Sequence, residues 1–509
     1  MDPYLVGFLA ATGVAVVMFV YGAAQVRKST DYLSYFLYKR DLRSGEYSYS
    51  FAAASTSLAT VLYYFVFLGV PHGLFILWSP LTYLVGALFF AIVLLPRLAS
   101  HGYLRDTTEQ EKEPEAVGEI LDARVTLGAY LAERYQSSAV AISVTIIASI
   151  GLLSILLIEL FVGVTIFSIY MKPGYVDFAL VFIALLVFCY TTLGGLYGVI
   201  KTDTFQLLLM LLASGVFLAW LVLRVGREGI PGAADFFPHP PPLSAGFLLP
   251  YPLLVNTLVV NFCLLPSLLR TWQMTAASSN VREARRGVMI GVGLTAALTL
   301  GFTLIGIWFF KSAFPQSGQA DMSLNGILII LAEQGGLIGS YVVFPLFLSA
   351  CLAALLSTAD SALLPLVQIL VRRRKKPGSI DWSRLSAAAV SVLLLTLTLV
   401  LYFVVFRVLK FDLMPWLFTI FSLVIIVAPA IIASIILPPH TLASKWMKGA
   451  ALVSLWGGIV LAFVISYSGS KMNLLAVVQL NSPLATAFGV ICMVVGFICA
   501  KVSDAKEHA

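Results

Sequence analysis

The chain consists of apolar runs about twenty residues long, separated by short polar segments. A helix of about 20 apolar residues crosses the hydrocarbon core of a bilayer, because it satisfies its backbone hydrogen bonds internally. By this measure the sequence contains about 13 spans. With 60% hydrophobic residues and a mean hydropathy of +0.95, the chain is too apolar for a soluble domain. We therefore predict an all-α polytopic membrane protein without a separate soluble domain.

The basic residues predict how these spans are oriented. Most of the 32 Lys and Arg residues lie in alternate loops, in clusters such as Arg27-Lys28 and Arg285-Arg286. Basic loops stay in the cytoplasm, so we expect a multi-pass protein of the cell inner (cytoplasmic) membrane, with its amino terminus outside and its carboxyl terminus inside. The net charge of +7 is thus a topology signal, and no basic patch for nucleic acid is indicated.

One apolar run carries a concentrated set of polar side chains. Residues 352–364 read LAALLSTADSALL and contain Ser357, Thr358, Asp360 and Ser361. Hydroxyl and carboxyl groups at membrane depth are costly to bury without partners, and they mark ion or substrate paths. This stretch is therefore the first candidate for a binding site.

A second hydroxylated stretch begins the span at about 46–68. It contains Ser55, Thr56, Ser57 and Thr60. Small residues of this kind allow close packing between membrane helices. They also occur where a helix is locally unwound and its free carbonyl groups line a cavity. Both interpretations stay open at this point.

Two acids also lie within apolar runs. Glu159 is well inside the span at 137–170, where a lone acid is either a functional residue or a hydrogen-bonded packing residue. Gly194 and Gly195 are predicted to end one helix, because glycine reaches positive φ without penalty. Asp203 then falls in the first turns of the next helix, where it could also simply favour the positive helix end.

Two further segments have a clear local signature. Asn256, Asn261 and Pro266 predict an irregular helix over about 250–270, because a proline and two amides interrupt its apolar run. Residues 126–135 predict a short amphipathic helix on the inner membrane surface.

The order of the spans predicts an inverted repeat. After the first helix, the core divides into two halves with an odd number of spans each, so the second half starts from the opposite side of the membrane. We predict a peripheral helix and loop at 1–45, a core at 46–436 with repeats at 46–225 and 250–436, and two peripheral helices with a short tail at 437–509.

Four segments resemble the sodium:solute symporter family, which includes the sodium/proline and sodium/galactose symporters. They are TTLGGLYGVIKTDTFQ at 191–206, LAALLSTADSALL at 352–364, LGAYLAERY at 127–135 and LRTWQMTAASSNVREARRG at 269–287. Their order and spacing extend the resemblance over nearly the whole chain. It implies a LeuT-type fold, with a 5+5 inverted-repeat core, one helix before the core and two after it.

The resemblance also implies a sodium site between the first and eighth core helices. Matched position by position, the site would use the carbonyl oxygens of Ala53, Thr56 and Ala354 and the hydroxyl groups of Ser357 and Thr358. Several neutral oxygens suit a hard monovalent cation that has lost its water. Sodium is then the coupling ion, and no organic cofactor is implied.

A second cation site, present in some family members, would match Asp203, Ser357, Asp360 and Ser361. Those members have serine where this chain has Asp360, so two carboxyl groups face one pocket here. Either a cation lies between them or one of them holds a proton, since two close carboxylates repel. A second sodium ion and proton coupling therefore both remain open.

The positions that match the substrate cavity of the family are Ser55, Thr60, Asn256 and Asn261. The run VLYYFVFLGVPH at 61–72 departs from the small, Gly-rich sequence that the family has there. The solute is therefore predicted only as small and polar.

Together these features predict a monomeric secondary transporter, which couples inward sodium movement to solute uptake by alternating access. One alternative is a proton-coupled symporter that uses Asp203 and Asp360. Another is a transporter-like sensor, which binds a solute and signals to a partner protein. An enzyme is not predicted, because the sequence has no nucleophile with a base, metal-ligand cluster or phosphate loop at a suitable spacing.

Overall fold

The structure is a computed structural model. It describes residues 2–29, 32–59, 65–103, 126–167, 176–226, 231, 233–236, 250–313, 324–371, 383–408, 413–471 and 475–507. In these ranges the chain is helical, and its one isolated bridge joins Leu42 to Ser278.

The helices follow one another along the chain in this order: α1 (Pro3–Ala24), α2 (Tyr32–Leu37), α3 (Ser44–Ser55), α4 (Phe65–His72), α5 (Trp78–Phe89), α6 (Leu95–Ser100), α9 (Leu127–Tyr135), α10 (Ser138–Phe167), α11 (Val176–Val225), α12 (Ala233–Phe236), α13 (Pro250–Ser267), α14 (Leu269–Ala277), α15 (Val281–Trp308), α16 (Leu324–Gln334), α17 (Gly336–Ile338), α18 (Phe344–Leu370), α19 (Ser383–Tyr402), α20 (Leu413–Ile425), α21 (Ala428–Ile436), α22 (Pro439–Leu442), α23 (Lys445–Lys471), α24 (Leu475–Gln479) and α25 (Asn481–Glu507). Short 3₁₀ turns lie at Gln25–Arg27, Tyr38–Arg40 and Gly73–Leu77, and π-helical turns lie at Phe90–Leu94, Phe309–Ala313, Gly339–Val343 and Phe403–Val408.

Ten helical segments of the described chain are long and apolar enough to cross a membrane, or 11 if the bent pair α13–α14 is one span. Even the larger count, 11, is lower than the predicted total of about 13, for two reasons. The first core span is interrupted at Thr56, so α3 with its 12 residues is too short to be counted as a span. In addition, α11 joins two predicted spans into one long helix with a kink.

The kink in α11 confirms the predicted break at Gly194-Gly195. Gly195 has φ +56° and ψ −154°, a backbone conformation that favours glycine. A Cβ atom at this position would also lie 2.7 Å from the carbonyl oxygen of Tyr35. The second half of α11 then carries Asp203 into the region where α11 contacts α3 and α18.

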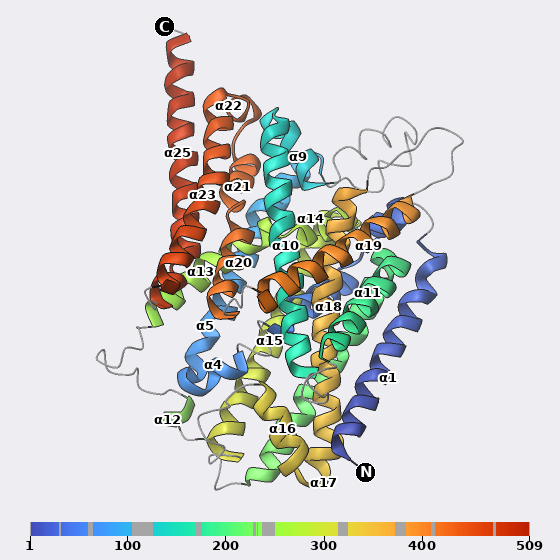
Figure 1. The fold of residues 1–509 in the computed structure, drawn as a ribbon. Helices are drawn as coiled ribbons and strands as arrows, with labels where there is room; N and C mark the ends of the chain where they lie inside the picture. The colour runs from blue at the N-terminus through green and yellow to red at the C-terminus, as the bar shows by residue number, and fades with distance from the viewer. Residues whose placement is uncertain are drawn as a thin grey trace.

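The central helix of the bundle is α18, which Figure 1 shows between α10, α11 and α1. Its side chains are buried almost without interruption from Phe344 to Gln368. By contrast, α23 and α25 pack on each other at one edge and expose large apolar side chains such as Val460 and Phe463. Exposed apolar surface of this kind suits contact with lipid, whereas the buried α18 suits a site inside the protein.

The first core helix is both interrupted and closely packed, which are the two interpretations that its sequence left open. It is broken, because α3 ends at Ser55 and Thr56 has non-helical backbone angles (φ −94°, ψ 68°). It is also closely packed, because a Cβ atom on Gly287 of α15 would lie 2.6 Å from the side chain of Tyr47. Residues 60–64 lie outside the described part of the chain.

The two segments with a local signature are both helical, one short and one irregular, as predicted. The short amphipathic helix is α9, and its first turn is capped by Thr126, whose hydroxyl accepts a hydrogen bond from the Ala129 N–H. Buried Arg134 of α9 donates to the carbonyl oxygens of Ser434 (2.8 Å) and Leu437 (2.5 Å) at the end of α21. The predicted irregular helix is the pair α13–α14, which is bent by 45°.

Candidate functional site

The end of α3 meets the polar stretch of α18. The Thr358 Oγ1 donates to the carbonyl oxygen of Ala54, at a distance of 3.3 Å. The last carbonyl groups of a helix have no partner within that helix, so they are available to a neighbour or to an ion. The break after α3 therefore turns backbone oxygens toward a hydroxyl group of α18.

The residues predicted to bind sodium lie on the two sides of this α3–α18 junction. The N–H of Thr56 is 3.1 Å from the carbonyl oxygens of both Ala52 and Ala53, and the Thr56 Oγ1 donates to Ala52 at 2.8 Å. On α18, Ala354 is buried one turn before Thr358. Of the predicted sodium ligands, the structure shows the Thr358 hydroxyl in contact with a backbone oxygen of α3, that of Ala54.

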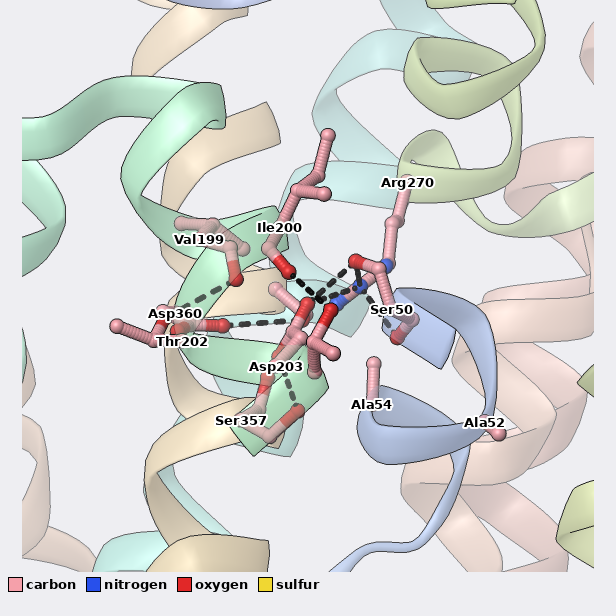
Figure 2. Close-up of polar contacts among 12 residues, drawn as sticks. Ser50, Ala52, Ala54, Val199, Ile200, Thr202, Asp203, Arg270, Ser357 and Asp360 are labelled. Carbon is pink, nitrogen blue, oxygen red and sulfur yellow. Dashed lines mark hydrogen bonds and ion pairs between the residues drawn. The ribbon is translucent and has the colours of Figure 1, made fainter. Parts of the chain in front are cut away.

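Asp203 is a fully buried acceptor at the side of the same junction, as Figure 2 shows. Its Oδ1 accepts a hydrogen bond from the Ser357 Oγ (2.5 Å), and its Oδ2 accepts one from the Ser50 Oγ (2.5 Å). The Arg270 Nη2 lies 3.0 Å from Oδ2 and forms an ion pair with it. This carboxylate therefore links α3, α11, α14 and α18.

The sequence interpretation assigned no role to Arg270. Its Nη2 also donates to the carbonyl oxygen and to the Oγ of Ser50, both at 2.8 Å. Its Nε and Nη1 are buried and have no hydrogen-bond partner in the described chain. The signal was present in the segment LRTWQMTAA, because an arginine in such an apolar setting needs a buried acid.

Asp360 has different partners. Its Oδ2 accepts from the Tyr190 Oη (2.6 Å), and its Oδ1 accepts from the Ser361 Oγ (3.1 Å). Tyr190 also donates to the carbonyl oxygen of Leu356 at 3.1 Å, and Ser361 donates to that of Ser357 at 2.5 Å. Asp360 is fully buried and forms no ion pair with a described residue. The two acids of the predicted second cation group thus have different partners: Asp203 pairs with an arginine, whereas Asp360 has only hydroxyl donors. Ser357 and Ser361 connect the two acids by hydrogen bonds.

Glu159 of α10 binds the interrupted segment that follows α3. Its Oε1 accepts from the Ser57 Oγ, and its Oε2 accepts from the N–H of Leu58 at 3.2 Å. Backbone donors at a break need acceptors, and this carboxyl group supplies one from a neighbouring helix. The lone acid of the sequence is thus hydrogen-bonded directly to the broken first core helix.

A cavity of about 230 Å³ lies beside these groups. Its wall comes from α3, α4, α5, α10, α13, α14, α15, α18 and α20 and includes Ser55, Asn256 and Asn261, which were predicted to bind substrate. Thr60, the fourth predicted residue, lies outside the described part of the chain. Most of the described wall is apolar, and its charged members are Glu159 and Arg270.

The predicted substrate residues differ in their remaining capacity to bind. The Asn261 Nδ2 donates to the carbonyl oxygen of Ser79 (2.8 Å) and to the Thr82 Oγ1 (2.9 Å), so it already links α13 to α5. The Ser55 Oγ is 3.3 Å from the Tyr83 Oη. The Asn256 Oδ1 is buried without a partner in the described chain. A buried polar atom of this kind calls for a ligand or an ordered water.

No protein-family model and no curated protein matches the sequence. Among solved structures, the chain is similar to a Na+-coupled sialic acid symporter in its substrate-bound outward-open state. The TM-score is 0.70, the identity is 18%, and the match covers 98% of this chain and 97% of that one. Weaker likenesses are MhsT in complex with L-phenylalanine (TM-score 0.47, 16% identity, 89% and 98% covered) and a manganese transporter from Eremococcus coleocola (TM-score 0.46, 12% identity, 95% of each covered). The first of these similarities shows that the chain has the predicted LeuT-type fold of a multi-pass membrane protein.

Proposed function

We propose that the protein is a secondary transporter that couples inward sodium movement to uptake of a small solute by alternating access. The observation that carries this proposal is the α3–α18 junction, where an interrupted membrane helix meets the Thr358 hydroxyl beside a central cavity. Broken helices next to a central site are a recurring feature of secondary transporters.

Sodium would be held by the carbonyl oxygens of Ala53, Thr56 and Ala354 and by the hydroxyl groups of Ser357 and Thr358. An ion in this position joins α3 to α18, so it stabilises the conformations in which the two helices are close. A ligand shifts such an equilibrium only by its difference in affinity between the states. The membrane potential adds a driving free energy of about 2.3 kcal/mol per charge per 100 mV.

The likeness to a Na+-coupled symporter supports sodium as the coupling ion. It also supports the predicted division of the chain into an inverted-repeat core between peripheral helices. We further infer the inner membrane as its location, with the amino terminus outside and the carboxyl terminus in the cytoplasm, because of the basic loops.

A second candidate is proton coupling at Asp360. In its cluster, two buried carboxyl groups face one guanidinium group, and Asp360 has only the hydroxyl donors Tyr190 and Ser361. A proton on Asp360 would remove the excess negative charge from this buried site. The second cation ligand set of Asp203, Ser357, Asp360 and Ser361 would then carry a proton in place of a second sodium.

Thermal unfolding of the purified protein in NaCl and in KCl of equal ionic strength tests sodium binding directly. We expect NaCl to raise the unfolding temperature, because an ion that binds the folded state stabilises it by mass action. Reconstituted liposomes then separate the candidates: uptake driven by an inward sodium gradient supports symport, and uptake driven by a proton gradient supports coupling at Asp360. Solute binding without any flux would favour the sensor, and an equal response to both salts would contradict the sodium site.

A further inference from the structure

We infer that the central cavity takes an amphipathic organic amine in its cationic form, with the ammonium group on Glu159 and the apolar body against the aromatic wall. This inference rests on the proposed transport function, because it names the class of solute that the cavity would carry.

The wall of the cavity favours an apolar body with a positive head group. Four aromatic side chains from α3, α4, α5 and α20 line it: Phe51, Phe65, Tyr83 and Phe421. The rings of Phe51 and Tyr83 are stacked, with 6.3 Å between their centroids and 13° between their planes. Aromatic faces carry partial negative charge, so they attract a cation as well as packing against carbon atoms.

The charges of the cavity wall leave one negative charge without a counterion. Arg270 is already neutralised by Asp203, whose Oδ2 lies 3.0 Å from the Arg270 Nη2. Glu159 is only 1% exposed and forms no ion pair with any described residue. An isolated carboxylate in an apolar site is strongly unfavourable, so a cation that enters the cavity gains by compensating it.

The hydrogen-bonding atoms of the wall point to the same head group. A carboxylate can accept about four hydrogen bonds, and the described donors to Glu159 are the Ser57 hydroxyl and the backbone N–H groups of Leu58 and Ala59, so it can accept one more. The buried Asn256 Oδ1 is a second acceptor that has no partner in the described chain. Two acceptors suit the N–H donors of a primary or secondary ammonium group.

A carboxylate ligand is the competing possibility, because the Nε and Nη1 of Arg270 also lack partners. The charge balance disfavours it. Since Arg270 is paired with Asp203, an added carboxylate would place another negative charge in a cavity that already contains Glu159.

Three ligands with the same phenyl body and different head groups test the inference: 2-phenylethylamine, 2-phenylethanol and 3-phenylpropionate. Binding to the full-length protein is measured by calorimetry and by thermal shift at pH 7, in NaCl. We expect the amine to bind about tenfold or more tightly than the alcohol, because a charge-assisted hydrogen bond replaces a neutral one. The propionate is expected not to bind. Equal binding of amine and alcohol, tighter binding of the propionate, or no binding of any of the three would overturn the inference.

A charge-removing variant, Glu159→Gln, sharpens the test. Glutamine keeps an oxygen for the Leu58 N–H, so the break stays capped, but the preference for amine over alcohol should disappear. Glu333→Gln is the matched control, because Glu333 lies on α16 and accepts from the Tyr4 hydroxyl at 3.0 Å in an exposed setting. A preserved amine preference in Glu159→Gln would contradict the inference, and the three wild-type measurements decide if this variant does not fold.

The sodium measurement separates a failure of this inference from a failure of the proposed function. If NaCl stabilises the protein but the amine does not bind, the solute class is wrong and sodium coupling stands. If the amine binds but NaCl and KCl act alike, the cavity assignment stands and sodium coupling is wrong.

Discussion

Two ion pairs of the described chain each include a residue of α11, Lys201 in one and Asp203 in the other. The two pairs differ in their exposure to solvent. The Lys201 Nζ lies 2.7 Å from the Glu46 Oε1, and each side chain is 30% exposed. The Arg270 Nη2 lies 3.0 Å from the Asp203 Oδ2, with side chains 12% and 0% exposed. By distance alone the Lys201–Glu46 pair would be the stronger of the two, but water and salt screen an exposed pair. Burial, more than distance, therefore determines how much unfolding free energy is lost when one partner is removed.

The largest effect is expected for Asp203→Ala, which leaves Arg270 buried without a counterion. Breaking a buried pair in this way costs about 3–5 kcal/mol of unfolding free energy. Thermal unfolding of the purified protein measures the loss. The double variant Asp203→Ala with Arg270→Ala should recover part of it, because both charges are gone. If Asp203→Ala is as stable as the wild type, burial does not determine the unfolding free energy that is lost when this pair is broken.

The next effect concerns the hydroxyl groups that lie beside the buried pair. Ser357→Ala with Thr358→Ala should raise the sodium concentration for half-maximal stabilisation by about tenfold or more, because two proposed ligands are lost. The control is Ser349→Ala, which removes a buried hydroxyl of α18 that donates to the Pro345 carbonyl of its own helix at 2.8 Å. Unchanged sodium dependence in the double variant would disprove the assignment.

A smaller effect on stability is expected for Asp360→Asn. Asparagine has nearly the shape of a protonated aspartic acid and keeps an acceptor for Tyr190, so the loss should be no more than about 1 kcal/mol. The pH profile of uptake in liposomes should flatten, because the residue can no longer take up or release a proton. A loss as large as that of Asp203→Ala, or an unchanged pH profile, would contradict a proton on Asp360.

The smallest effect is expected for Lys201→Met at the exposed pair. Such pairs contribute about 0–1 kcal/mol, so the unfolding temperature should hardly change. The Tyr38 hydroxyl, which also donates to Glu46 at 2.9 Å, keeps this carboxylate in place. At high salt the difference in unfolding temperature between the variant and the wild type should be smaller still, since screening weakens the pair. A loss comparable to that of Asp203→Ala would remove the contrast between the two pairs.

Features that depend on a short stretch of sequence were predicted well. The helices at α9 and α18, the kink at Gly195 and the bend that follows Pro266 each follow from local hydrophobicity or from the backbone preference of one residue. The interruption after Ser55 was one of two interpretations, because a small hydroxylated stretch serves close packing and an unwound helix equally well.

Pairings between distant residues could not be predicted in the same way. Arg270 and Asp203 are 67 positions apart, and Leu58 and Glu159 are 101 apart. The sequence indicates that each buried charge needs a partner, but only the packing of the helices selects which one. For this reason neither the pairing of Asp203 with Arg270 nor the hydrogen bond of Asp360 with Tyr190 was predicted.

The contact between Glu159 and the Leu58 N–H has a consequence for measurement. In a regular helix, an amide proton is held by a carbonyl of its own chain segment, and its exchange with solvent reports the local or global opening of that segment. Here a carboxylate from another helix holds the amide proton. The exchange rate of this amide proton would therefore change when Glu159 gains or loses a ligand. Mass spectrometry or NMR could measure this change without an attached label.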